Sequence, residues 1–135
     1  MKIIFVVGLP ASGKTHYVQS IKNTSDVFID DPSDITNVFN TCDEAKAKKV
    51  NVYIADPKLC VCNILRSAVD MVKERYADAE LEFVYFDNNP NQCQINASLR
   101  LQKEPGKKVS NFISQLSSVY KPNSIYKGKL IKVYS

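Results

Sequence analysis

The chain has 135 residues, of which 44% are hydrophobic and 24% are charged, and its formal net charge at pH 7 is +4. This length predicts a single domain over residues 1–135, large enough to bury a core and too short for a second catalytic module. The composition is typical of a globular protein in water, and no apolar stretch is long enough to cross a membrane, which excludes a membrane-spanning protein.

The positions of the cysteines and lysines bear on compartment and partners. The lysines after residue 120 lie in a tail without acidic residues, which favours a phosphorylated or polyanionic partner only weakly. The cysteines lack the spacing of a zinc site, and nothing in the sequence indicates secretion. We therefore predict a cytoplasmic protein with reduced, buried thiols at Cys42, Cys60, Cys62 and Cys93.

The first predicted element is a strand at 3–7, because this apolar run is too short for a secretory signal and leads straight into a loop motif. Residues 8–15 read Gly-Leu-Pro-Ala-Ser-Gly-Lys-Thr, which matches the phosphate-binding pattern G-x-x-x-x-G-K-[ST]. A strand, this loop and a helix in direct succession form the structural context that the motif requires. The sequence therefore predicts binding of a nucleoside triphosphate.

Each part of this motif has a chemical reason. Gly8 and Gly13 let the backbone approach phosphate oxygens, so that N–H groups and the N-terminus of the next helix point at negative charge. Lys14 supplies a positive charge toward the β- and γ-phosphates, and we expect that charge to be exposed in the empty loop. Thr15 is placed to bind Mg²⁺. The predicted ligands are ATP and Mg²⁺, and the predicted binding residues are Gly8, Pro10, Ala11, Ser12, Gly13, Lys14 and Thr15.

Helices and strands alternate along the rest of the chain. Helical periodicity predicts helices at 14–21, 32–49, 61–76 and 109–120, the first of which carries His16 on its surface. Apolar runs predict further strands at 27–29, 50–55, 81–86 and 130–134. Since parallel strands need right-handed helical crossovers, this order predicts an α/β fold in which helices cover both faces of a five-stranded, mainly parallel sheet.

Residues 90–101 fit two structures. Apolar side chains alternate strictly with polar ones from Cys93 to Leu101, which locally indicates a strand. Asn89 as an N-cap followed by Pro90 in the first helical position indicates a helix instead. Periodicity alone does not decide between them.

Polar residues follow each of the first four predicted strands. The phosphate-binding loop follows the first, Asp30 and Asp31 the second, Asp56 the third and Asp87 the fourth. Ligands of parallel sheets gather at the carboxyl ends of the strands, so we expect these residues to share one edge of the sheet.

On these residues the chain resembles the kinase domain of phage-type 5′-polynucleotide kinases, within the larger group of P-loop kinases. The match covers nearly the whole chain and includes Arg100, which follows Phe86-Asp87. The resemblance implies a three-layer P-loop kinase fold with a short mobile lid between Asn88 and Lys108. It also implies the roles of three residues besides Lys14: general base for Asp30, a lid contact to the donor phosphates for Arg100, and a place near Mg²⁺ for Asp56.

The chain departs from this family at two positions. Ser33 stands where an arginine usually grips the phosphate of the acceptor, and Asn96 stands where a second lid arginine is common. Bland alternatives also exist: a solvated strand-end or helix-capping role for Asp30, a helix cap for Asp31, and a surface charge for Arg100.

The leading hypothesis is an ATP- and Mg²⁺-dependent kinase that phosphorylates a hydroxyl group. The first candidate for its acceptor is a polynucleotide or nucleotide-like 5′-OH. Phosphoryl transfer needs positioning, cations on the phosphate oxygens and a carboxylate that orients the hydroxyl, and this set of residues can supply them. A small-metabolite kinase and a nucleotide-binding regulatory protein with little turnover are the alternatives.

Overall fold

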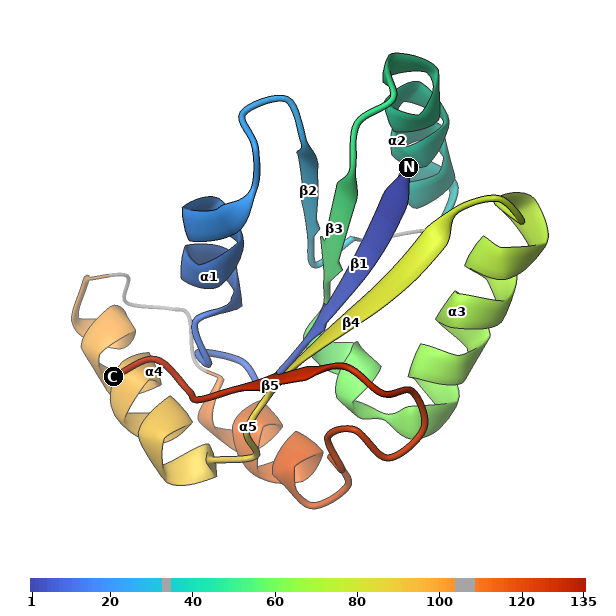
Figure 1. Ribbon diagram of the computed structural model, residues 1–135. Coiled ribbons are helices and arrows are strands. Elements are labelled where there is room, and N and C mark those ends of the chain that lie inside the picture. Colours follow the sequence, from blue (N-terminus) through green and yellow to red (C-terminus); the bar gives the residue numbers. More distant parts are fainter. Residues whose placement is uncertain (33–34, 104–108) are drawn as a thin grey trace.

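Five parallel strands form the central sheet of the computed structural model, which describes residues 1–32, 35–103 and 109–135 (Figure 1). The strands are β1 (Lys2–Val7), β2 (Val27–Asp30), β3 (Val52–Ala55), β4 (Glu80–Phe86) and β5 (Lys129–Ile131). Their order is β2-β3-β1-β4-β5, and every pairing between them is parallel. The predicted α/β sheet is confirmed, and its strands point their carboxyl ends to one edge.

Helices connect the strands as the alternation predicts. They are α1 (Lys14–Ile21), α2 (Ile35–Lys48), the 3₁₀ turn η1 (Pro57–Cys60), α3 (Cys62–Arg75), α4 (Pro90–Lys103) and α5 (Ser110–Ser117). None of the helices in the described part of the chain has the length and apolar character that a membrane span requires.

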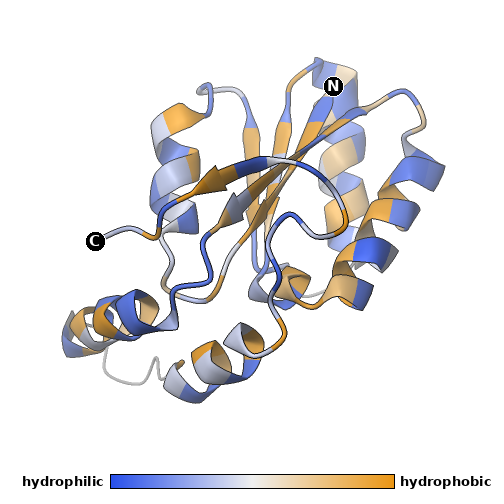
Figure 2. Cartoon of the chain, turned by 60° about the horizontal axis from the view of Figure 1, so that its bottom comes forward, coloured by the Kyte–Doolittle hydropathy of each residue, from blue (hydrophilic) through white to orange (hydrophobic). Residues whose placement is uncertain are grey.

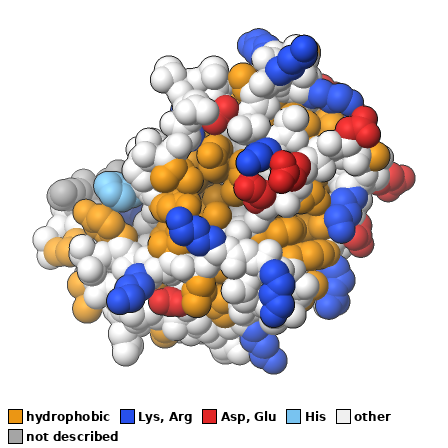
Figure 3. All heavy atoms as spheres, viewed as in Figure 1, with side chains coloured by type: hydrophobic (Ala, Val, Ile, Leu, Met, Phe, Trp, Pro, Cys, Tyr) orange, Lys and Arg blue, Asp and Glu red, His pale blue; other side chains and the backbone are white. Residues whose placement is uncertain are grey.

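The core lies on both faces of β1, the central strand. Ile3, Phe5 and Val7 point into a large apolar cluster with α2, α3 and α5, whereas Ile4 and Val6 point into a smaller cluster with α1. Figure 2 shows the hydrophobic strands at the centre and helices that are hydrophilic on part of their surface. Figure 3 shows hydrophobic side chains across the middle of the visible side of the molecule. The sheet is therefore covered more completely on one face than on the other.

The structure decides the ambiguous segment in favour of a helix. Asn89 Oδ1 accepts a hydrogen bond from the backbone N–H of Gln92 at 3.1 Å, which caps the start of α4. Cys93 and Ala97, four residues apart, are buried on one face of this helix, whereas Ile95 is 54% exposed. The strand interpretation is wrong because only part of the alternating apolar set packs against the core.

The last strand is shorter than predicted. β5 ends at Ile131, and the following residues leave the sheet, so that the backbone N–H of Tyr134 donates to Ser12 O at 3.0 Å. The end of the chain therefore lies against the phosphate-binding loop, beside α4 (Figure 1).

Candidate active site

The loop between β1 and α1 has the backbone that close approach to phosphate requires. A Cβ on Gly8 would lie 2.6 Å from Ser12 Oγ and 3.0 Å from Phe86 Cβ, so no side chain fits there. Gly13 has a φ of 102°, in the left-handed region, and a Cβ on it would lie 2.6 Å from Tyr134 Cβ. The first N–H groups of α1 have no partner within the helix and face the space beyond the loop. This geometry fits the anion site predicted from the motif.

Lys14 is held more tightly than predicted. Its Nζ donates to the carbonyl oxygens of Gly8 and Leu9, each at 2.8 Å, and the residue is only 7% exposed. The expectation of an exposed charge is therefore wrong, because the loop carbonyls curl around the ammonium. Burial lowers the pKa of Lys14, and nearby groups that include Asp30 oppose this shift. The lysine is part of the internal structure of the loop as well as its candidate phosphate ligand.

Thr15 and Asp30 meet across two elements. The Thr15 hydroxyl donates to Asp30 Oδ2 at 3.1 Å, and both side chains are exposed. Thr15 lies in the first turn of α1 and Asp30 ends β2, so the sheet edge brings them together as expected. Hydroxyl and carboxylate oxygens are the donors that Mg²⁺ prefers. The described residues contain no group of three or more His, Cys, Asp or Glu side chains that could hold a metal by themselves.

Asp56 has a local role in the structure. Its Oδ1 accepts from the backbone N–H of Lys58 at 2.9 Å and caps η1. Burial raises the pKa of Asp56, the Lys58 N–H opposes that shift, and the charge of Asp31 adds to it. Its place near Mg²⁺ remains a prediction.

One cleft of about 920 Å³ contains most of the predicted site residues. Loop residues 10–15 line it together with Asp30, Asp31, Asn96 and Arg100. The size falls within the usual range of small-molecule sites. Arg100, exposed on α4, therefore faces the same space as the phosphate-binding loop, as its assignment requires.

Asn96 connects α4 to two other segments. Its Nδ2 donates to Ala11 O at 3.0 Å and to Tyr134 O at 2.6 Å, and its Oδ1 accepts from Gln92 Nε2 at 3.0 Å. The residue that replaces the usual lid arginine therefore fastens the helix to the loop. α4 fills most of the segment in which the resemblance implies a lid, and residues 104–108 lie outside the described part of the chain.

Several residues that line the cleft are not predicted as site residues from the sequence, among them Tyr134 and Phe112. Tyr134 lines the cleft from the C-terminal segment, and its ring packs on His16 with centroids 4.8 Å apart. His16 is exposed on α1, as predicted. Phe112 of α5 also lines the cleft, whereas the sequence predicts only that it belongs to a helix. Neither Tyr134 nor Phe112 belongs to a motif, so the sequence carries no signal for them.

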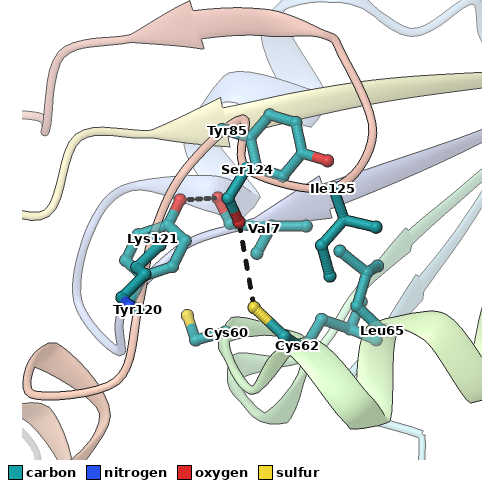
Figure 4. Close-up of a pocket in the computed structure, with 10 residues that line it drawn as sticks. Val7, Cys60, Cys62, Leu65, Tyr85, Tyr120, Lys121, Ser124 and Ile125 are labelled. Atoms are coloured by element: carbon teal, nitrogen blue, oxygen red, sulfur yellow. Dashed lines mark hydrogen bonds between the residues drawn. The ribbon is translucent and has the colours of Figure 1, made fainter.

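A second cavity, near η1, has no room for a substrate. Its volume is about 10 Å³, roughly that of one water molecule, and Figure 4 shows Cys60, Cys62, Tyr120 and Ser124 around it. Tyr120 OH donates to Val7 O at 3.2 Å and to Phe86 O at 2.6 Å, which braces the carboxyl ends of β1 and β4. The region around Tyr120 therefore stabilises the end of β1, directly before the phosphate-binding loop.

The cysteine prediction holds for three of the four residues. All four thiols are free; Cys42, Cys60 and Cys93 are buried. Cys62 is only partly buried, and its Sγ lies 3.8 Å from Ser124 Oγ. Burial raises the pKa of Cys60 to about 12, which keeps it a protonated thiol at neutral pH.

Comparisons with known proteins agree with this fold. No family model matches the chain. An uncharacterised protein of Acanthamoeba polyphaga mimivirus, R277, is 29% identical over 122 residues, which cover 88% of this chain and 86% of that protein. A gluconokinase from Sinorhizobium meliloti 1021 has a similar structure, with a TM-score of 0.58 at 17% sequence identity over 99% of this chain and 83% of the gluconokinase. The chain therefore has a P-loop kinase-like fold, which confirms the predicted fold class.

Proposed function

We propose that residues 1–135 form a single-domain P-loop kinase that transfers the γ-phosphate of ATP to a hydroxyl group. The observation that carries this proposal is the shared cleft: the phosphate-binding loop, a carboxylate hydrogen-bonded to the loop threonine, and an arginine from another helix all line it. These are the parts that phosphoryl transfer needs from a protein.

Each part has a role in this proposal. The loop N–H groups and Lys14 bind the phosphates, and Arg100 adds a positive charge from α4. Asp30 orients the acceptor hydroxyl and takes its proton. Mg²⁺, when bound with the nucleotide, neutralises phosphate charge, and Thr15 would hold it, with Asp56 near its water shell.

The acceptor is the finer part of the proposal. Our first candidate from the sequence is a polynucleotide or nucleotide-like 5′-OH, and a small metabolite is the alternative. Ser33, which replaces the acceptor-binding arginine of the resembled family, lies outside the described residues. The choice between a polynucleotide and a small-metabolite acceptor therefore depends on the charges of the described residues around Asp30.

A transfer assay tests the proposal. The protein is incubated with γ-labelled ATP, Mg²⁺ and a panel of 5′-OH oligonucleotides, nucleosides, sugars and polyols, and both label transfer and ADP formation are measured. We expect ADP formation that depends on an added acceptor. Tight ATP binding with no such turnover on any acceptor would contradict the kinase proposal and support a nucleotide-binding regulatory protein.

A variant tests the role of the base. Asp30→Asn keeps an oxygen for the Thr15 hydroxyl, so we expect an ATP affinity close to that of the wild type and a kcat lowered by roughly 10²–10⁴-fold. Asp78→Asn is the matched control, because Asp78 is exposed in the turn that precedes β4 at the far edge of the sheet. An unchanged kcat in Asp30→Asn would remove Asp30 from the mechanism.

A further inference from the structure

The cleft has two ends with different walls. At one end, Tyr134 packs on His16 and is fastened to α4 through Asn96. At the other end, Asp31 lies where β2 and β3 finish, since its N–H donates to Ala55 O at 2.7 Å. Figures 1 and 2 place α4 and the C-terminus together, with α5 beneath the carboxyl ends of the strands. Under the proposed function, Asp30 is the base, so the end that holds Asp30 is the acceptor end.

The wall of this acceptor end is acidic and apolar. Its charged side chains are Asp30 and Asp31, and its apolar side chains are those of Pro57, Val109 and Phe112. α5, which carries Phe112, packs on η1, which begins at Pro57, and also on α4, so this apolar surface extends from the acidic end toward the helix that carries Arg100. An acceptor here meets two carboxylates and a hydrophobic surface.

The cations of the cleft are needed elsewhere. Among the described residues that line it, the Lys and Arg side chains are Lys14 and Arg100. Lys14 is enclosed by the phosphate-binding loop, and Arg100 is the cation on α4 that faces the same loop. Both are occupied by the several negative charges of a nucleoside triphosphate. A second phosphate group, on the acceptor, would find no further lysine or arginine among the described residues that line the cleft, and would meet two carboxylates.

The geometry points to an acceptor that carries no phosphate: a neutral or positively charged hydroxyl compound with an apolar ring or face, of which a nucleoside is one example. This inference rests on the proposed function, because it assigns the acceptor of that reaction. It favours the small-metabolite kinase over the polynucleotide kinase. Asp30 and Asp31 discriminate against anionic acceptors by charge repulsion at short range.

Matched acceptor pairs test this inference. Thymidine and thymidine 3′-phosphate both carry a 5′-OH, and sorbitol and gluconate differ mainly in charge. We expect kcat/KM to be at least about tenfold higher for the uncharged member of any pair that is used. Asp31→Asn should reduce this ratio by about fivefold, whereas Asp78→Asn should leave it unchanged. Asparagine tolerates the positive φ of 49° at this position, so the fold is preserved. Preference for the phosphorylated or carboxylated member overturns the inference.

A binding measurement covers the case in which no acceptor of the panel turns over. The protein is saturated with a non-hydrolysable ATP analogue and titrated with inorganic phosphate. We expect no detectable phosphate binding to the wild type and measurable binding to Asp31→Arg, with Asp78→Arg as the control. Phosphate binding by the wild type, or no gain in Asp31→Arg over its control, refutes the inference. Failure of the analogue to bind at all refutes the proposed function instead.

Discussion

Replacing Asn96 by alanine removes three hydrogen bonds that join α4 to its surroundings. Two of them leave the helix, to Ala11 O and Tyr134 O, and the third is to Gln92 within it. If each contributes about 0.5–1.5 kcal/mol, and the bond within the helix lies at the low end, the loss amounts to about 2–3 kcal/mol. Alanine returns up to about 0.7 kcal/mol through its better helix propensity. We expect the free energy of unfolding to fall by roughly 1.5–2.5 kcal/mol.

Urea denaturation without nucleotide measures this change, and Asn91→Ala is the matched control. Asn91 lies on the same helix, is exposed, and makes none of these bonds, so its replacement should leave stability nearly unchanged. We also expect ATP affinity in Asn96→Ala to fall several-fold in a fluorescence titration, because the Ala11 carbonyl loses its tie to α4. Equal stability of the two variants, within about 0.5 kcal/mol, would refute the argument that Asn96 fastens this helix to the loop.

Three further predictions concern charges. Lys14→Met should abolish ATP binding measured by calorimetry, and normal affinity would contradict the nucleotide site. The free energy of unfolding without ATP should change little, because removal of a buried charge stabilises the fold and loss of two hydrogen bonds destabilises it. Arg100→Ala should lower kcat by about tenfold or more with a smaller effect on ATP affinity, since its proposed role is to stabilise charge in the transition state; steady-state kinetics and an ATP-binding titration check this, and equal losses would make Arg100 a ground-state contact. Hydrogen bonds from Arg75 and Tyr76 hold the pKa of Asp43 below its ordinary value of 3.8, so the stability that separates wild type from Asp43→Asn should be present at pH 5–7 and shrink progressively as the pH falls below 3.8 and through the lower pKa of the folded state; a difference in denaturation experiments that does not shrink as the pH is lowered below 3.8 would contradict this origin.

Local patterns in the sequence predict the loop and the sheet because both follow short-range rules. The apolar run before the loop could only be buried, and the glycine spacing has a direct backbone meaning at Gly8 and Gly13. The order of strands and helices then determines a parallel sheet through the handedness of crossovers. The convergence of Thr15 and Asp30 follows from that topology, and the structure confirms it at 3.1 Å.

The remaining details depend on contacts between distant segments. The burial of Lys14 depends on how the loop carbonyls curl back on the side chain, which no pattern of residue types encodes. In the sequence, Asn96 is notable only because it stands where the resembled family commonly has a lid arginine. Its hydrogen bonds to Ala11 and Tyr134 join three segments that are far apart in the sequence. Asp56 caps η1, which the sequence does not predict, and its place near a metal stays a prediction. Tertiary packing decides such cases.

The contacts of Tyr134 with Ser12 and Gly13 determine where an affinity tag can be placed. An affinity tag added after Ser135 would begin next to the phosphate-binding loop. We expect such a tag to hinder nucleotide binding or to weaken the hydrogen bond between Tyr134 N and Ser12 O. The other terminus is a safer place, because Met1 O accepts from Glu80 N at the start of β4, at the opposite edge of the sheet (Figure 1). Purification by an N-terminal tag, with a tag-free sample for comparison, therefore avoids a false loss of activity.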